Sequence, residues 1–121
     1  MILVDTSVWV DHLRAGDAKL AALLDAARVL VHPFVIGELA CGNLSRRGEV
    51  LRLLHDMPAA PVALDAEVLV FIERHRLMGR GIGYVDAHLL ASAALAEPAQ
   101  LWTRDQRLGA VARALRVAYA A

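Results

Sequence analysis

Short apolar runs alternate with amphipathic stretches along the whole chain. Ile2-Leu3-Val4 has the pattern of a strand buried on both faces, and apolar residues then recur at helical spacing from Val8 to Leu13. Further apolar runs predict strands at 29–31, 101–103 and 117–119, and an extended stretch or short strand at 61–64. Because no two of these strands are joined by a hairpin signal, the pattern predicts an α/β fold with a mainly parallel sheet.

Periodicity and end signals place helices between these strands. Asp17 and Asp65 stand where N-caps are expected, Pro33 fits the first position of a helix, and Gly79–Gly83 punctuates a loop. One predicted helix follows Asp17 and reaches Ala27, and the next runs from Pro33 to about Leu44. A further helix ends before Pro58, and three more cover 65–78, 85–96 and 105–115. Glu97, beside the Pro98 that stops one of them, receives no role.

The composition is that of a single domain over residues 1–121. Hydrophobic residues make up 58% of the chain, above the usual range, yet no apolar run approaches the length of a membrane span. The excess therefore indicates a heavily buried sheet, a subunit interface, or both. No signal peptide is visible, and one cysteine cannot form an internal disulfide, so we expect a cytoplasmic protein with Cys41 as a small core residue.

Most acidic residues have an arginine one helical turn away or lie at a helix start, which is typical of solvated helix faces and caps. Those with such an arginine are Asp11, Asp25, Glu49, Asp56 and Glu73. Glu38 and Asp86 differ, because only apolar or small residues lie one turn from them. A buried carboxylate without compensation is unfavourable. We therefore expect each to find a tertiary partner, change protonation or bind a cation.

Two further acids follow predicted strands. Asp5 comes after Ile2-Leu3-Val4, and Asp105 comes after Leu101-Trp102-Thr103. If these strands are parallel neighbours, both acids lie at one sheet edge, where α/β proteins bind ligands, and Glu38 and Asp86 can reach that edge from their helix starts. The oxygens of four carboxylates are hard ligands, which would select Mg²⁺ or Mn²⁺. The alternative for Asp5 is a helix cap, although Thr6 and Ser7 can also cap.

Four motifs, in order and spacing, make the chain resemble a PIN domain of the VapC type, the ribonuclease toxins of bacterial toxin–antitoxin pairs. They are Val4-Asp5-Thr6-Ser7-Val8-Trp9, Phe34-Val35-Ile36-Gly37-Glu38-Leu39-Ala40, Tyr84-Val85-Asp86-Ala87-His88-Leu89-Leu90-Ala91 and Leu101-Trp102-Thr103-Arg104-Asp105. The resemblance covers essentially the whole chain. Any one motif is weak, but four in sequence are specific.

The resemblance implies a PIN-like three-layer α/β/α sandwich and a metal-dependent endoribonuclease. By this analogy Asp5, Glu38, Asp86 and Asp105 are the catalytic and metal-binding residues, and Thr6 and Thr103 match hydroxyl positions beside them. Bound Mg²⁺, or Mn²⁺ in its place, would activate a water that attacks an RNA phosphodiester, leaving a 5′-phosphate. A homodimer and a silencing VapB-like antitoxin are also implied. His88, two residues after Asp86, faces away on a helix, which favours packing or an interface over catalysis.

The overall charge becomes compatible with RNA once this cluster is set apart. Thirteen acids minus the four clustered acids leave nine, against thirteen basic residues, so the remaining surface carries a net charge of +4. Candidate phosphate contacts are Arg46, Arg47, Arg74, Arg76, Arg80, Arg104 and Arg107, each of which is otherwise a solvated surface arginine. Arg104 is the strongest candidate because it adjoins Asp105.

Two other function classes fit the predicted fold. A phosphoacceptor or phosphatase domain would have a lysine after a late strand or an Asp-x-Asp motif, but the only lysine is Lys19 and position 7 is Ser7. A non-catalytic binding module is the second alternative, and the intact acids argue against it. Metal titration separates an enzyme from such a module.

Overall fold

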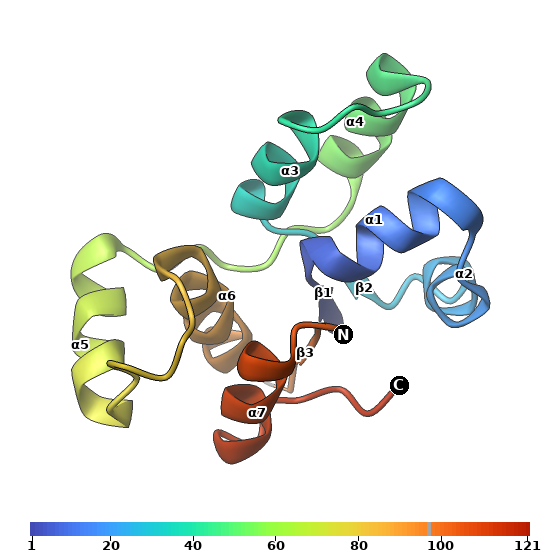
Figure 1. The fold of residues 1–121 in the computed structure, drawn as a ribbon. Coiled ribbons are helices and arrows are strands. Elements are labelled where there is room, and N and C mark those ends of the chain that lie inside the picture. Colours follow the sequence, from blue (N-terminus) through green and yellow to red (C-terminus); the bar gives the residue numbers. More distant parts are fainter. Residues whose placement is uncertain (97) are drawn as a thin grey trace.

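A three-stranded parallel sheet lies at the centre of the computed structural model, which describes residues 1–96 and 98–121; Glu97 lies outside the described residues. The strand order is β2-β1-β3, with β1 at Ile2–Val4, β2 at Val29–Leu30 and β3 at Gln100–Trp102. Leu3 of β1 pairs with residues of both neighbours. In Figure 1, α1 and α2 lie on one side of the sheet and α5 and α6 on the other. The predicted α/β/α sandwich with a mainly parallel sheet is confirmed.

Helices connect the strands. Their bounds are α1 (Thr6–Ala15), α2 (Ala18–Asp25), α3 (Pro33–Ala40), α4 (Arg47–Asp56), α5 (Asp65–His75), α6 (Tyr84–Leu95) and α7 (Gln106–Ala114). The predicted cap Asp17 is present, because its side chain accepts a hydrogen bond from the Leu20 N–H at 2.9 Å. Asp105, predicted as the first residue of a helix, is instead the N-cap of α7 and accepts from the Leu108 N–H at 2.9 Å. Among the described residues, no helix combines the length and the apolar character needed to cross a membrane.

Several predicted helix boundaries were wrong. Helix α3 ends at Ala40 rather than near Leu44, because Cys41 caps it and the Gly42 N–H turns back to the Leu39 carbonyl. Helix α5 ends at His75 rather than Met78, where Arg76 adopts a left-handed conformation with φ of 53°.

Asp65 is not the cap predicted for α5. It lies inside the first turn, and the preceding Leu64 is the N-cap. The Leu64 N–H donates to the Glu67 carboxylate at 2.8 Å, so the capping acid is the third residue of the helix instead of the residue before it.

The outer edges of the sheet are shorter than predicted. Within the described residues, 117–119 contributes a single bridge between Leu101 and Ala118 rather than a strand, and 61–64 forms none. On the opposite edge, Val31 bridges to Ala59. Each edge segment therefore adds one bridge to the parallel sheet and then leaves it.

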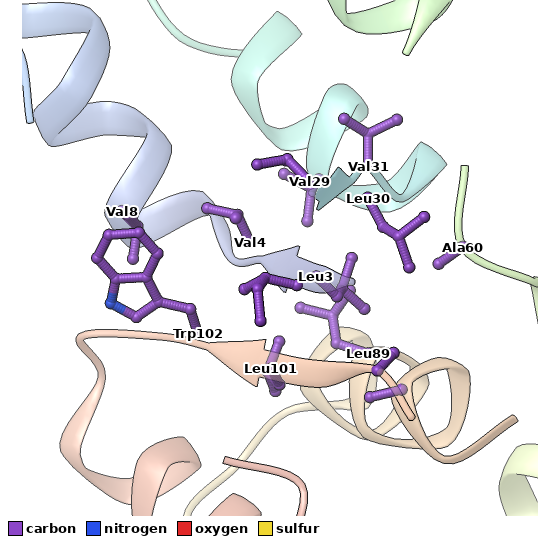
Figure 2. Close-up of a cluster of buried hydrophobic side chains, with 14 of the residues drawn as sticks. Leu3, Val4, Val8, Val29, Leu30, Val31, Ala60, Leu89, Leu101 and Trp102 are labelled. Carbon is purple, nitrogen blue, oxygen red and sulfur yellow. The ribbon is translucent and has the colours of Figure 1, made fainter. Parts of the chain in front are cut away.

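The core is built where helices cover both faces of this sheet. Figure 2 shows Leu3, Val29 and Leu101 from the three strands converging with Leu89 of α6. All three residues of β1 are at most 1% exposed, as expected for a strand covered on both faces. The prediction that Cys41 belongs to this core was wrong, because its position at the end of α3 leaves it exposed.

Candidate metal centre

Asp5 leaves the end of the central strand and is only 7% exposed. Two hydroxyl groups donate to the same oxygen, Oδ2: Ser7 Oγ at 2.9 Å and Thr103 Oγ1 at 2.7 Å. Among the described residues, the Asp5 side chain makes no capping bond to helix α1. The capping alternative therefore does not account for Asp5. Its carboxylate is instead oriented by residues from both ends of the chain.

Glu38 approaches the same edge from helix α3. Thr6 Oγ1, one residue after Asp5, donates to Glu38 Oε1 at 2.6 Å. The expectation that Glu38 is buried was wrong, because Val35 and Leu39 face the core while Glu38 beside them is exposed. The carboxylate is thus held by a hydroxyl group but open to solvent, as a ligand for an exchangeable cation must be.

Asp86 carries the electrostatic evidence that the four acids are close together. Burial raises the pKa of its carboxyl, and the negative charges of Asp5, Asp105 and Glu38 raise it further, against a backbone hydrogen bond from Gly83 that lowers it. That bond, 3.0 Å from the Gly83 N–H to Oδ2, fixes Asp86 at the start of α6. Asp86 therefore lies within electrostatic range of the other three predicted acids at the carboxyl edge of the sheet.

Asp105 joins the cluster through the turn that follows β3. Its backbone N–H donates to Thr103 Oγ1 at 3.1 Å, and Thr103 in turn donates to Asp5. Its Oδ1 caps helix α7. One carboxylate oxygen of Asp105 therefore caps α7, and its backbone is linked to Asp5 through Thr103.

The donor set fits a hard divalent cation, although it is not a closed cage. Carboxylates are the ligands that Mg²⁺ and Mn²⁺ prefer. Among the described residues, no three His, Cys, Asp or Glu side chains converge closely enough to hold an ion by themselves. This agrees with Mg²⁺ chemistry, because that ion usually keeps several waters and takes one or two protein carboxylates.

Arg104 does not extend toward substrate as the sequence predicts. Its guanidinium donates to Asp11 in α1 and to Asp17, the N-cap of α2. His88 is 1% exposed and packs against Phe34 and Tyr84, so the expected packing role describes its position.

Sequence reasoning missed two features of the site. Ser7 was considered only as a helix cap, whereas it links the Arg104 backbone N–H to Asp5. The partners of Arg104, Asp11 and Asp17, were assigned to a solvated helix face and a cap. The bonded partners lie 87 to 97 residues apart, so helix or strand spacing cannot reveal these bonds. The Thr-Ser and Thr-Arg-Asp motifs are the one signal of them in the sequence.

Comparisons with known proteins agree with this geometry. The PIN domain family model matches residues 2–114. Ribonuclease VapC32 from two strains of Mycobacterium tuberculosis, CDC 1551 / Oshkosh and ATCC 25618 / H37Rv, is 52% identical over 120 residues, which is 99% of this chain and 97% of the relative.

A solved structure supports the fold independently. The crystal structure of FitAcB from Neisseria gonorrhoeae superposes with a TM-score of 0.60, covering 93% of this chain and 94% of that chain, at 21% identity. Whole-length sequence identity and the shared fold lead to one family. The chain belongs to the PIN-domain family and, within it, to the VapC-type ribonucleases.

Proposed function

We propose that this protein is a metal-dependent endoribonuclease, a single nuclease domain over residues 1–121 that acts as the toxin of a toxin–antitoxin pair. The observation that carries the proposal is the set of hydroxyl groups that hold carboxylates at one sheet edge: Ser7 and Thr103 donate to Asp5, and Thr6 donates to Glu38. The 52% identity to Ribonuclease VapC32 supports RNA as the substrate. We expect it to act in the cytoplasm, where RNA is available.

Asp5, Glu38, Asp86 and Asp105 would hold the cation, one or two of them directly and the others through its waters, with Mg²⁺ as the expected ion and Mn²⁺ as a substitute. When bound, the cation supplies positive charge that acidifies a water and offsets the charge of the phosphate. The chain itself supplies orientation. The Thr6 hydroxyl holds Glu38, and the Gly83 N–H holds one oxygen of Asp86 and leaves the other available. An in-line attack by the water would leave a 5′-phosphate product.

A groove beside Glu38 supports the antitoxin as partner. It encloses about 340 Å³ between α1, α3 and α4, and its lining includes Val10, Leu13, Leu39, Leu44 and Val50. Glu38, Arg14, Asn43 and Ser45 also line the groove. The mixture suits an amphipathic helix that packs its apolar face on the apolar side chains and places a basic side chain at Glu38. Such a helix would place its cation against Glu38 and so compete with the metal. A complex in which the groove stays open and cleavage continues would contradict this assignment.

The face formed by α5 and α6 supports a homodimer. Val70 and Leu95 are 57% and 55% exposed, and they line an apolar groove of about 540 Å³. Glu67 lies at one part of the same groove and Arg74, two turns further along α5, at another. A two-fold axis that pairs α5 of two copies antiparallel would bring each glutamate to the other copy's arginine. The second copy of this chain is therefore the occupant that we propose.

The proposed function is tested with Asp5→Asn. Because the Asp5 side chain makes no capping bond to α1 and an asparagine oxygen can accept the two hydroxyl bonds, α1 should remain intact by circular dichroism. Loss of a charged metal ligand should reduce RNA cleavage by about 100-fold or more. Cleavage by wild-type protein with Mg²⁺ should also stop in EDTA. Wild-type cleavage that continues in chelator, or a mutant with normal activity, would refute the proposal.

A further inference from the structure

Arg104 joins the loop between β3 and α7 to two acids on the other side of the site. Its Nη1 donates to Asp11 Oδ2 at 2.5 Å, and its Nη2 donates to Asp17 Oδ2. The guanidinium carbon also lies 5.7 Å from the centroid of the Trp102 ring. Both terminal nitrogens and one face of the guanidinium are therefore engaged by protein. A phosphate contact would have to displace these carboxylates.

Asp17 is itself a fixed anchor. Its other oxygen, Oδ1, caps α2 through the Leu20 N–H, and its own N–H donates to His12 Nδ1 at 3.0 Å. The Leu20 hydrogen bond, followed by that from Arg104, lowers the pKa of Asp17, which keeps the carboxylate ionised. Arg104 is thus tied to a residue that cannot move without uncapping a helix.

The backbone of Arg104 leads directly to the acidic cluster. Its N–H donates to Ser7 Oγ at 3.0 Å, and Ser7 Oγ donates to Asp5 Oδ2. Thr103, the preceding residue, donates to the same oxygen, and Asp105 is the following residue. Displacement of Arg104 would therefore move Thr103, a donor to Asp5, together with the carboxylate of Asp105, and would break the bond that orients Ser7.

We infer that Arg104 is a positioning residue: its ion pairs with Asp11 and Asp17 hold residues 103–105 against α1 and so set the geometry of Asp5 and Asp105 for metal binding. The inference rests on the proposed metal-dependent function. Because the Arg104 side chain is 37% exposed, its ion pairs add little to folding stability. Ligand geometry is far more sensitive, since small displacements reduce metal affinity and turnover strongly.

The test compares Arg104→Ala with Arg14→Ala. Arg14 pairs with the same Asp11 at 3.5 Å but from within α1, with a side chain 76% exposed, so it is a matched control. We expect Arg104→Ala to weaken Mn²⁺ binding to the RNA-free protein by about tenfold, measured by titration calorimetry, and to lower kcat by at least as much. KM should change less than about twofold. Arg104→Lys should fall between Ala and wild type, because lysine lacks the planar fork.

A second set of variants keeps the test valid if Arg104→Ala unfolds. Asp17→Asn preserves a capping oxygen for α2 and removes the charge that pairs with Arg104. The double variant Asp11→Asn/Asp17→Asn should reproduce the loss of Mn²⁺ affinity. Adding Arg104→Ala to it should cause little further loss, because all three changes act through one interaction.

Two results would overturn the inference. Unchanged Mn²⁺ affinity with a raised KM and a weaker salt dependence would place Arg104 on RNA phosphate. Equal losses in Arg14→Ala would show a general charge effect. Wild-type protein that neither binds Mn²⁺ nor cleaves RNA would instead refute the proposed function, so the two failures are distinguishable.

Discussion

The four carboxylates of the candidate metal centre lie in different environments. Asp5 is nearly buried but receives two hydroxyl hydrogen bonds, whereas Glu38 is exposed and receives one. Asp86 is partly buried, and its pKa is raised by burial and by its three neighbours. The ionised form of Asp86 is therefore disfavoured, first by burial and then by the charges of its neighbours. A neutral residue at this position should remove both effects.

We predict that Asp86→Asn raises the melting temperature of the metal-free protein. Because the pKa of Asp86 is raised on folding, its ionisation weakens the folded state as pH rises above the ordinary carboxyl range. Asparagine can still accept the Gly83 hydrogen bond. Relief of about 1 kcal/mol corresponds to a gain of a few degrees. Thermal melting with EDTA and with excess Mg²⁺ measures this, and the mutant should lose the Mg²⁺-induced rise. An unchanged melting temperature in EDTA would show that the carboxylates do not repel each other.

At the scale of elements, a buried histidine connects α3 to α6. His32 is 0% exposed and caps α3 by accepting from the Phe34 N–H through Nδ1 at 3.1 Å. Its Nε2 lies 3.1 Å from Ser92 Oγ, so the neutral imidazole donates there. Burial first, and then the charge of His88, lowers the pKa of His32 to about 4. The element carrying Glu38 is thus joined to the element carrying Asp86 by a histidine that stays neutral.

This bond predicts a pH dependence of folding. The unfolded chain protonates His32 near pH 6.5 and the folded chain near pH 4, so stability falls as pH drops through this window. The loss has an upper limit of about 3 kcal/mol. His32→Asn keeps a capping oxygen and should flatten the dependence of the free energy of unfolding on pH from about 4 to 6.5.

Urea unfolding at several pH values measures this effect. His55→Asn makes the same substitution at an exposed position of α4 and should retain the wild-type slope. Ionisation of Asp86 makes stability fall as pH rises, which is opposite to the effect of His32. Because Asp86 is present in all three proteins, its contribution cancels when their slopes are compared. A His32→Asn slope equal to that of wild type would mean that His32 is already charged in the folded protein.

At the scale of the whole molecule, the exposed groove between α5 and α6 predicts how two copies assemble. Reversal of one charge, in Glu67→Arg or Arg74→Glu, should place like charges opposite each other and shift the protein toward monomer. The double variant restores both pairs and should restore the dimer. Light scattering over micromolar concentrations measures the mass. Arg113→Glu, at an exposed site on α7, controls for net charge. A double variant that stays monomeric would exclude this antiparallel register.

Spacing along the chain is enough to predict the fold class and a set of four candidate acids. Apolar runs of three residues identify strands buried on both faces, because only helices on each side can cover them. An acid that follows such a strand, or lacks a partner one turn away, is visible in the spacing alone. For these reasons the spacing alone predicts Asp5, Glu38, Asp86 and Asp105 as one set, and in the structure the charges of the other three raise the pKa of Asp86 beyond the effect of its burial.

Which polar groups surround these acids depends on contacts between distant segments, which the folded chain alone reveals. The bonds from Thr103 to Asp5, from the Arg104 N–H to Ser7 and from the Arg104 side chain to Asp17 join segments whose separation leaves no periodic signal. The apolar pattern also does not predict which residues at the ends of helices are buried, and Cys41, at the end of α3, is exposed. Local spacing reports which face of an element is apolar. It does not report which charge from another element lies opposite, because that depends on how the packed helices cross.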